Sequence, residues 1–386
     1  MTKLLIVSQH FYPSNTATAQ LLYDLADYLN NHSTLTVLTQ EPQPRPLKHL
    51  NVISTLKSGT SRKRLLYKLF SGLQFLFQAA FYIINNRKRI DSLLIVSNPP
   101  FISLLLPLAA LCNVSKTTFL FQDLFPRTAI LAGIIPAKGP LTSFLGNLIR
   151  LSLNQARVIV LSSSMKSRLY CDFGIPSTVV PNWKIDSDNL SYSDCRQPFH
   201  PIPRSSNTLL ILYSGNFGRL HDILTLLEAA RLLTSYPVHF AYVGTGVKLS
   251  QIHQFKTDFN LTNISIHGPF PRQHLTQLLD SADFCSLSII PGAEDTIAPS
   301  KLLGILAAGK PVLLVSSRNS ELASLIKSYS CGITVEPGDA VSLAQSIKQL
   351  IQSPSVLTQM SNNSLRCYSD NYGKQTSFEA YKDLLL

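Results

Sequence analysis

The residues best suited to bind a phosphate are at positions 212–222, LYSGNFGRLHD, between an expected strand and an expected helix. Glycines let a backbone approach a phosphate closely, and the N-terminus of a helix offers free N–H groups. Arg219 could pair with a diphosphate through two parallel hydrogen bonds. The run therefore indicates a phosphate site, and the alternative is a tight strand-to-helix turn that binds nothing.

A second candidate is at positions 294–312, EDTIAPSKLLGILAAGKPV, where an acidic loop leads into a helix. Pro299 or Ser300 begins this helix, and Gly309 follows its end as a C-terminal cap. Lys301 lies in the first turn, where a cation is usually unfavourable because the helix N-terminus is already positive. A bound anion would explain the lysine, and a solvated lysine is the alternative.

Other chemistries lack their motifs in this sequence. Neither glycine run has the spacing G-x-G-x-x-G of a dinucleotide site. The six cysteines include no C-x-x-C pair, so we expect no zinc site and no disulfide framework, but free thiols in a reducing compartment. No D-x-D pair in a suitable loop indicates a metal, and no two carboxylates form a glycosidase pair.

The elements that must position these candidates alternate between strand and helix. The expected strands are apolar throughout, which is typical of a parallel sheet covered on both faces. We therefore predict an α/β protein with two doubly wound, Rossmann-like domains in tandem. The expected strands are 3–8, 35–39, 93–97, 118–122, 158–162, 177–181, 208–213, 239–243, 264–267, 284–289 and 312–315, and the expected helices include 19–29, 223–233, 300–308 and 341–351.

The domain boundary is a polar, Pro-rich stretch at 186–207, which we interpret as a linker. It separates an N-terminal domain, 1–185, from a C-terminal domain, 208–369, and a helix near 370–386 could pack back on the first domain. Open α/β sheets bind ligands at the carboxyl ends of their strands. Two such domains facing a central cleft would suit a two-substrate reaction, with one substrate on each domain.

The positive charge of the chain is concentrated in its first half. The net charge is +12, and residues 1–200 carry 20 Lys and Arg against 9 Asp and Glu, whereas residues 201–386 carry 14 against 13. A basic surface attracts nucleic acid, anionic lipid or phosphorylated substrates. Nucleic acid is the least favoured of these, because the basic residues flank an apolar helix and are not interleaved with stacking platforms.

That helix is at positions 65–84, LLYKLFSGLQFLFQAAFYII, with three basic residues on either side. Lys68, Ser71, Gln74 and Gln78 recur at helical spacing and predict a polar stripe, which argues against a membrane span. We predict an amphipathic helix in the bilayer interface, and the alternatives are a helix buried against the sheet and a true span. The expected headgroup contacts are Arg62, Lys63, Arg64 and Lys68.

The ordered set of motifs resembles glycosyltransferase family 4, most closely its colanic-acid and O-antigen sugar transferases. The second half contains YSGN-x-GR-x-HD, YVGTG, APSKLLGILAAGKPV and CGITVEPGD in the family's order. The first half contains LIVSQHFYP, QDLFP and VPNW, at positions 5–13, 122–126 and 180–183. The resemblance implies a GT-B fold, an acceptor on the N-terminal domain and a nucleotide-sugar donor on the C-terminal domain.

The resemblance also implies the chemistry and its residues. Sugar transfer would proceed with retention at the anomeric carbon, without a metal or another cofactor, from a donor that is most plausibly a UDP-sugar. The acceptor would be linked to a polyprenyl diphosphate or be a polysaccharide, at the inner face of the membrane. The implied catalytic residues are Asp123, Arg219 and Lys301, the implied donor-binding residues are Gly215, Asn216, Gly218, Gly244, Gly268, Phe270, Glu294, Asp295, Ser300 and Leu302, and the implied acceptor-binding residues are His10 and Asn98.

The sequence departs from the family pattern where the family has two glutamates. Their places hold Thr296 and Gly304, with Glu294 and Asp295 close to the first. Arg127 stands where an acidic residue is usual, and residues 14–17 replace a glycine-rich loop. These departures motivate an alternative, a catalytically inactive GT-B protein that acts as a membrane-associated binding subunit. Because the N-terminal apolar run is too short for a signal peptide, we expect a cytoplasmic protein.

Overall fold

The computed structural model describes residues 1–14, 16–42, 50–55, 65–185, 202, 207–271 and 274–386. The chain divides into two units. Unit 1 comprises Met1–Ile185, Thr296–Ala298 and Lys374–Leu386, and unit 2 comprises Asp186–Asp295 and Pro299–Gly373. Most of the predicted linker, and the predicted lipid contacts Arg62, Lys63 and Arg64, lie outside the described residues.

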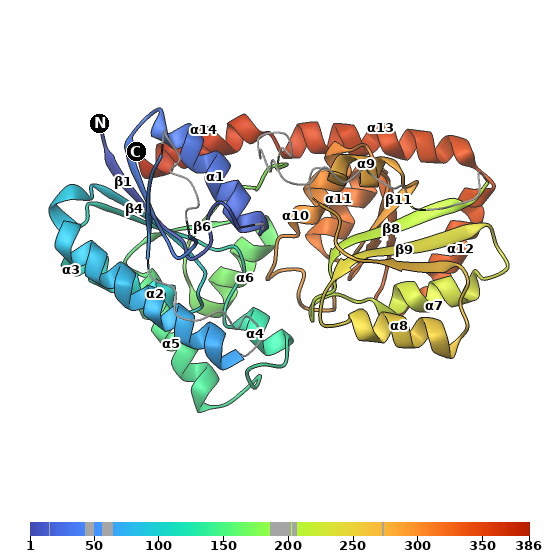
Figure 1. The fold of residues 1–386 in the computed structure, drawn as a ribbon, viewed down its shortest axis with the longest axis horizontal. Helices are drawn as coiled ribbons and strands as arrows, with labels where there is room; N and C mark the ends of the chain where they lie inside the picture. The colour runs from blue at the N-terminus through green and yellow to red at the C-terminus, as the bar shows by residue number, and fades with distance from the viewer. Residues whose placement is uncertain (15, 43–49, 56–64, 186–201, 203–206, 272–273) are drawn as a thin grey trace. The chain divides into compact units, whose positions relative to one another are not determined.

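In its described residues, unit 1 contains a sheet of seven parallel strands in the order β3-β2-β1-β4-β5-β6-β7 (Figure 1). The strands form because short apolar runs are bounded by turn residues, and the central ones are buried on both faces. They are β1 (Lys3–Val7), β2 (Thr34–Thr39), β3 (Asn51–Ser54), β4 (Ser92–Val96), β5 (Lys116–Leu120), β6 (Arg157–Val160) and β7 (Thr178–Val179).

The helices of unit 1 bury their apolar faces against this sheet in one core. Side chains of the C-terminal helix belong to that core, and Phe378 packs on Trp183 with a ring-centroid distance of 4.8 Å. The helices are α1 (Ala17–Asn30), α2 (Leu65–Asn86), α3 (Leu105–Leu111), α4 (Arg127–Leu131), α5 (Pro140–Leu153), α6 (Ser163–Phe173) and α14 (Lys374–Leu385). Two 3-10 turns, Arg87–Arg89 and Ile102–Leu104, adjoin α2 and α3.

In the described residues of unit 2, six parallel strands form a second sheet in the order β10-β9-β8-β11-β12-β13. Successive side chains of a strand point to opposite faces, so the sheet has a core on each side. The strands are β8 (Leu209–Asn216), β9 (Val238–Thr245), β10 (Ile264–His267), β11 (Phe284–Ser288), β12 (Val312–Val315) and β13 (Gly332–Val335).

The helices of unit 2 cover both faces of its sheet. Residues of α7 (Leu224–Leu232), α8 (Leu249–Asp258) and α12 (Ala340–Ile351) line one core. Residues of α9 (Leu275–Asp280), α10 (Ser300–Ala307), α11 (Glu321–Tyr329) and α13 (Pro354–Asn371) line the other. The predicted doubly wound architecture is therefore confirmed within each unit.

Both sheets reverse their strand order beside their first strand, and this reversal locates the candidate sites. In unit 1, β1 pairs with β2 on one side and β4 on the other. In unit 2, β8 pairs with β9 and β11 in the same way. The connections leave the sheet in opposite directions at such a point, which opens a crevice at the carboxyl ends of the strands. Functional side chains are therefore expected after β1 and β4, and after β8 and β11.

Candidate functional site

The crevice of unit 2 contains the side chain of Lys301, which comes from the first turn of α10. Its Nζ lies 3.6 Å from the ring centroid of Tyr213 on β8. Gly215 provides the space for this approach, because a Cβ there would lie 3.1 Å from Cε of Lys301. Both predicted candidates, the glycine-containing turn and the lysine, thus meet at one point.

The ammonium of Lys301 is buried and has no hydrogen-bond partner among the described residues. Burial lowers the pKa of Lys301 from 10.5 to about 7. An unpaired buried charge is costly unless an opposite charge neutralises it. A solvated lysine, the alternative considered from the sequence, is therefore wrong, and the position favours an anionic ligand.

His221 borders the same point from the loop after β8. Its Nδ1 lies 2.9 Å from the hydroxyl of Tyr213 and 2.8 Å from the backbone oxygen of Asn216. Burial, together with the charge of Lys301, lowers the pKa of His221 to about 4. The imidazole is therefore neutral at pH 7, and it fixes the phenol without adding positive charge.

Gly244 is a site of close backbone contact. A Cβ at Gly244 would lie 1.9 Å from the carbonyl oxygen of Gly215, and one at Gly246 would lie 2.4 Å from that of Phe217. Both glycines have positive φ values, of 141° and 152°. They let the end of β9 pack closely against the end of β8. The second glycine run therefore supports the backbone that carries Gly215.

Arg219 is exposed, and the structure gives it no ion pair among the described residues. Ser300 is the first residue of α10, whose N-cap position is occupied by Pro299 without a side-chain cap. Leu302 is buried in the core, and its N–H donates to the Pro299 carbonyl (3.0 Å). Of these residues, Arg219 and Ser300 remain available to a ligand.

The acidic pair before α10 has a partly structural role. One carboxylate oxygen of Glu294 accepts hydrogen bonds from the N–H (3.1 Å) and the hydroxyl of Ser317, which follows β12. Asp295 is the last residue of unit 2 before the segment Thr296–Ala298 of unit 1. The place of the second family glutamate, Gly304, is open, because a Cβ there would meet no atom within 4 Å.

Two other predicted donor-binding residues come from a different strand of the unit 2 sheet. Gly268 and Phe270 follow β10, which is the edge strand next to β9. Gly268 is exposed, and Phe270 packs against the core to which side chains of α9 and α10 belong. Their predicted role near the nucleotide base stays a prediction.

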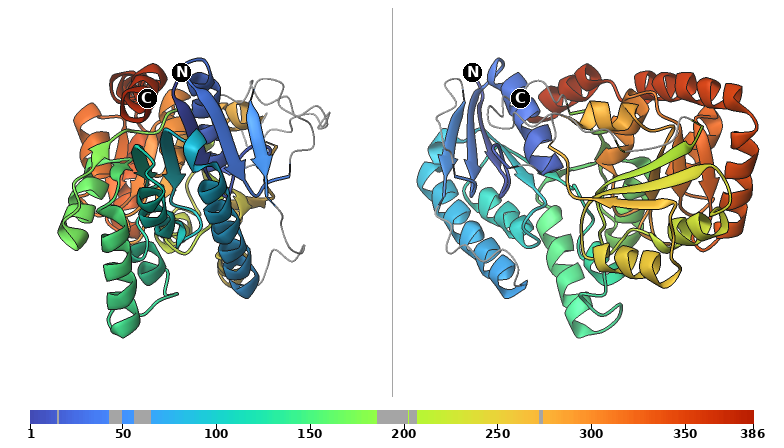
Figure 2. Two further views of the ribbon diagram at one scale, coloured as in Figure 1. Left: turned by 90° about the vertical axis from the view of Figure 1, so that its left-hand side faces the viewer. Right: turned by 45° about the vertical axis from the view of Figure 1, so that its right-hand side comes forward.

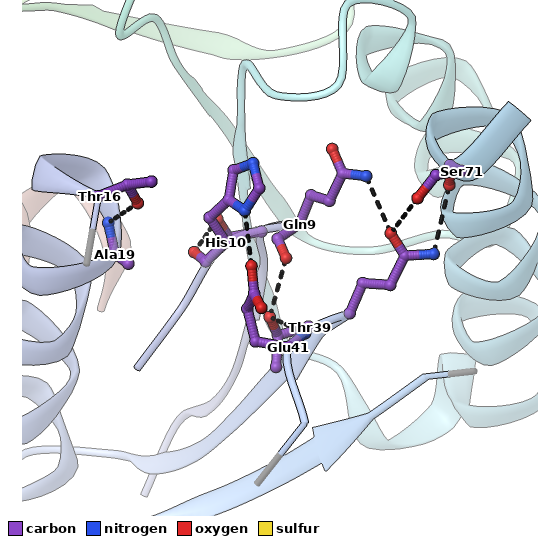
Figure 3. A network of polar contacts seen from close by, with 9 residues as sticks. Gln9, His10, Thr16, Ala19, Thr39, Glu41 and Ser71 are labelled. Atoms are coloured by element: carbon purple, nitrogen blue, oxygen red, sulfur yellow. Dashed lines mark hydrogen bonds and ion pairs between the residues drawn. The ribbon is translucent and has the colours of Figure 1, made fainter. Parts of the chain in front are cut away.

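In unit 1, a polar network joins the loops after β1 and β2 to each other and to α2 (Figure 3). The ring Nδ1 of His10, after β1, donates to Glu41, after β2, at 2.8 Å. Gln40 accepts hydrogen bonds from Gln9 and from Ser71 of α2, both at 2.9 Å. The network therefore ties the ends of β1 and β2 to α2 and holds His10 in place.

Asn98 and Asp123 follow β4 and β5, the next strands of the same sheet. Asp123 forms a β-bridge with Ile297, and the neighbouring Leu124 N–H donates to the Thr296 carbonyl (2.9 Å). Asp123 is exposed, yet the protein atoms around it raise the pKa of its carboxyl to about 6. Such a carboxyl can gain or lose a proton close to neutral pH.

Two of the predicted surface features have a different structural basis. The polar stripe of α2 faces the protein at Ser71, which is buried and bonded to Gln40. Arg127, in the place of an acidic residue, lies 4.0 Å from Asp172 of α6 and helps to hold α4 on that helix. Lys68 lies in α2, but its side chain is outside the described part of the structure.

Sequence analysis missed Tyr213 and His221 as site residues. Both occur in the run LYSGNFGRLHD, but an aromatic residue in a strand is normally part of the core, and a loop histidine is normally solvated. Their role depends on the contact between β8 and α10, which are far apart in the chain. The signal that could have found them was the buried lysine, since a buried cation needs an electron-rich neighbour.

Two features are absent from the described residues. No group of three or more His, Cys, Asp and Glu side chains there could hold a metal ion. No helix in the described ranges is both long enough and apolar enough to span a bilayer.

Comparison with known proteins supports the resemblance seen in the sequence. Residues 208–353 match the family model described as Glycosyl transferases group 1. The chain is 24% identical to WbjE of Pseudomonas aeruginosa, a glycosyltransferase by name, over 328 residues that cover 83% of this chain and 81% of WbjE. It is 30% identical to WcaI of Escherichia coli, a colanic acid biosynthesis glycosyl transferase by name, over 181 residues that cover 45% and 44% of the two chains.

Solved structures show the fold. Sucrose-phosphate synthase from Thermosynechococcus elongatus aligns with a TM-score of 0.76 at 14% identity, over 100% of this chain and 98% of that one. WaaG, a glycosyltransferase of lipopolysaccharide biosynthesis, aligns with a TM-score of 0.70 at 12% identity over 99% of both chains. HepE of Anabaena, solved with UDP and glucose, aligns with a TM-score of 0.68 at 17% identity over 99% of both chains. The predicted GT-B fold is confirmed.

Proposed function

We propose, from the premise that residues 208–353 form a glycosyl transferases group 1 domain, that this protein transfers a sugar from a nucleotide donor during the synthesis of a cell-surface polysaccharide. The names of WcaI and WaaG favour that process over other uses of the fold. The acceptor we propose is linked to a polyprenyl diphosphate or is a polysaccharide. His10, Asn98 and Asp123 on unit 1 are its proposed contacts.

The observation that carries the proposal is the buried, unpaired ammonium of Lys301 at the switch point of the unit 2 sheet. Breaking the bond between the sugar and the diphosphate leaves negative charge on the diphosphate. Lys301, Arg219 and the N–H groups at the start of α10 would stabilise that charge. The same groups would do the work of a metal ion, so we propose a reaction without one.

The details of the chemistry are also proposals. The family resemblance implies retention at the anomeric carbon, with the acceptor attacking the face from which the diphosphate leaves. We favour a UDP-sugar as the donor, because HepE, with the same fold, was solved with UDP and glucose. Glu294 and Asp295 would contact sugar hydroxyls, with Gly268 and Phe270 near the base.

The test is a binding measurement followed by a turnover assay. UDP, GDP and their sugars are screened for the rise in melting temperature that binding of a ligand to the folded state produces. We expect UDP to bind to the wild type and much more weakly to Lys301→Ala. The matched variant Lys310→Ala, in the turn between α10 and β12, should bind normally. Equal binding to all three proteins would refute the assignment of the diphosphate to Lys301.

We further propose that unit 1 binds an anionic membrane surface through α2 and α5. The exposed apolar side chains of α2 recur at helical spacing and form one stripe, which consists of Phe70, Leu73, Phe77, Phe81 and Ile84. Three exposed basic residues, Arg87–Arg89, follow the helix. The opposite face of α2, with Phe75, is buried in the core, so the helix is both packed on the sheet and apolar toward solvent.

A second stripe on α5 supports the same surface. Leu141, Phe144 and Leu151 are exposed, Phe144 by 62%. Helix α3 contacts both α2 and α5, and Figure 2 shows α2 and α5 extending from the same part of unit 1. Exposed aromatic residues beside lysine and arginine are typical of helices that lie in a membrane interface.

Sedimentation with vesicles tests this surface. The side chains of Phe77 and Phe81 are 70% and 71% exposed, so replacing both by Ser should leave the fold intact. We expect at least about tenfold weaker binding to vesicles that contain phosphatidylglycerol, because each ring contributes roughly 1–2 kcal/mol when it leaves water. The control is Leu224→Ser with Val341→Ser, two exposed apolar residues of unit 2. Unchanged binding of the Phe variant would remove α2 from the proposal.

The inactive binding subunit remains a second candidate, and one observation favours it. The open space at Gly304 means that the side chain expected to bind the donor ribose is missing and that no neighbour fills its place. A protein that binds UDP but neither hydrolyses nor transfers any UDP-sugar, with any polyprenyl-linked acceptor, would support this candidate.

A further inference from the structure

An unpaired ammonium needs something that keeps it at the diphosphate site before the ligand arrives. A lysine side chain has four rotatable bonds, and a buried one would gain by folding back toward water. Lys301 instead lies with its Nζ 3.6 Å above the ring of Tyr213. The ring face carries partial negative charge and attracts a cation.

We propose that Tyr213 is a positioning residue, whose ring holds the ammonium of Lys301 at the end of β8, and that His221 fixes the orientation of this ring. The inference rests on the proposed function, in which Lys301 contacts the donor diphosphate. Tyr213 itself does not touch the donor and acts through Lys301.

The ring of Tyr213 is held on all sides. Tyr213 is 1% exposed, and its centroid lies 5.3 Å from Phe217 and 6.2 Å from Tyr242. The hydroxyl contacts Nδ1 of His221 at 2.9 Å. The loop of His221 is in turn tied down by Lys248, whose Nζ donates to the His221 carbonyl at 2.6 Å. These contacts leave the phenol one orientation, with its face toward Lys301.

The titratable groups that act on the charge of Lys301 come from three elements, and each is neutral near pH 7. Burial raises the pKa of the Cys285 thiol on β11 to about 12. His221, after β8, is neutral because its pKa is lowered to about 4, and burial raises the pKa of the Tyr213 phenol on β8. None of these groups therefore carries a full negative charge that could attract the ammonium of Lys301. The attraction comes from the face of the Tyr213 ring.

Two substitutions separate the ring from its hydroxyl. Tyr213→Leu removes the ring, whereas Tyr213→Phe keeps it and removes only the hydroxyl, with its contacts to His221, the Asn216 carbonyl and Ser288. Cation–π contacts are worth about 0.5–2 kcal/mol, and 1.4 kcal/mol corresponds to about one pKa unit. We therefore expect the Leu variant to lose the proton of Lys301 about one pH unit lower than the wild type, and the Phe variant to titrate close to the wild type.

The readout is the pH titration of the Lys301 ε-carbon by NMR, in protein labelled with 13C-lysine and without ligand. Lys301→Met identifies the resonance by its loss. In the wild type the ε-protons should show an upfield ring-current shift, which the Phe variant keeps and the Leu variant loses. His221→Ala, which leaves the core intact, should reduce the shift because the ring is no longer fixed. A Leu variant with wild-type titration, or a wild type without a ring-current shift, would overturn the proposal.

A parallel titration of UDP binding by calorimetry separates this inference from the proposed function. If Lys301→Ala binds UDP as tightly as the wild type, the diphosphate assignment fails while the NMR result still decides the role of Tyr213. If Lys301→Ala loses binding but Tyr213→Leu keeps the wild-type pH dependence of binding, only the positioning role fails.

Discussion

Replacing Lys301 by Met should stabilise the protein at acidic pH while it removes nucleotide binding. Methionine has a similar length and no charge, so it can fill the same space beside Tyr213 and Gly215. The wild-type ammonium is buried without a hydrogen-bond partner in the described structure, so folding takes it out of water with only the ring face of Tyr213 to stabilise it. The Met variant should therefore be more stable, because it lacks a buried charge that is neutralised only when the ligand binds.

The size of the effect follows from the pKa of Lys301, which burial lowers from 10.5 to about 7. Between these values the unfolded chain binds a proton that the folded chain does not, so the stability of the wild type rises with pH. The rise is about 1.4 kcal/mol per pH unit once the folded lysine has lost its proton, which amounts to about 2 kcal/mol between pH 7, where half of the folded molecules are protonated, and pH 9. Below pH 7 the folded lysine is also charged, and its full cost is present.

The assay is denaturant unfolding at pH 6, 7, 8 and 9, followed by circular dichroism and by tryptophan fluorescence. The sequence has one tryptophan, Trp183, which is in unit 1, so fluorescence reports unit 1 alone and the remaining ellipticity change reports unit 2. We expect the advantage of Lys301→Met in the unit 2 transition to shrink by about 2 kcal/mol between pH 7 and pH 9. An advantage that does not depend on pH, or a loss of stability at pH 6, would refute the reasoning.

Three further predictions concern single residues of unit 2. Gly304→Ala should raise the free energy of unfolding by about 0.5–1 kcal/mol, because the position is inside α10 and a Cβ there meets no atom within 4 Å; a denaturation curve measures this, and destabilisation would contradict it. Gly244→Ala should destabilise unit 2 by more than about 3 kcal/mol, because its Cβ would lie 1.9 Å from the Gly215 carbonyl at a φ of 141°; normal expression and melting would show that the strands can separate at little cost. Arg219→Ala should reduce turnover or UDP affinity at least tenfold with an unchanged melting temperature, since the side chain is exposed, and Arg231→Ala on α7 is the control; equal activity of the two variants would exclude Arg219 from the site.

The sequence predicted the two doubly wound sheets because their strands are short apolar runs between clear turn signals. Two edge strands were missed. In β3 only Val52 and Ile53 are apolar, and β13 begins with Gly332, whose missing side chain lets the strand approach the Val312 carbonyl. Edge strands are buried less, so their sequences show less of the apolar pattern on which such predictions rely.

The candidate site was predicted through its charges and glycines but not through its neutral aromatic neighbours. Arg219 and Lys301 are conspicuous because charge at a turn or at a helix N-terminus needs a reason. Tyr213 looks like any core residue of a strand, and only the packing of α10 across the end of β8 gives it a partner. Likewise, the helix at 65–84 was recognised as amphipathic, but the face that meets the protein could not be identified until Ser71 was found bonded to Gln40.

The small segment Thr296–Ala298 limits how the protein can be dissected. It leaves unit 2 between Asp295 and Pro299 and pairs with Asp123 and Leu124 of unit 1, and its Thr296 is fully buried. A gene cut at the linker would therefore separate this tripeptide, as well as α14, from the rest of unit 1. Chimaeras that exchange donor specificity between relatives will need to graft residues 296–298 and 374–386 together with the first 185 residues, as one discontinuous module.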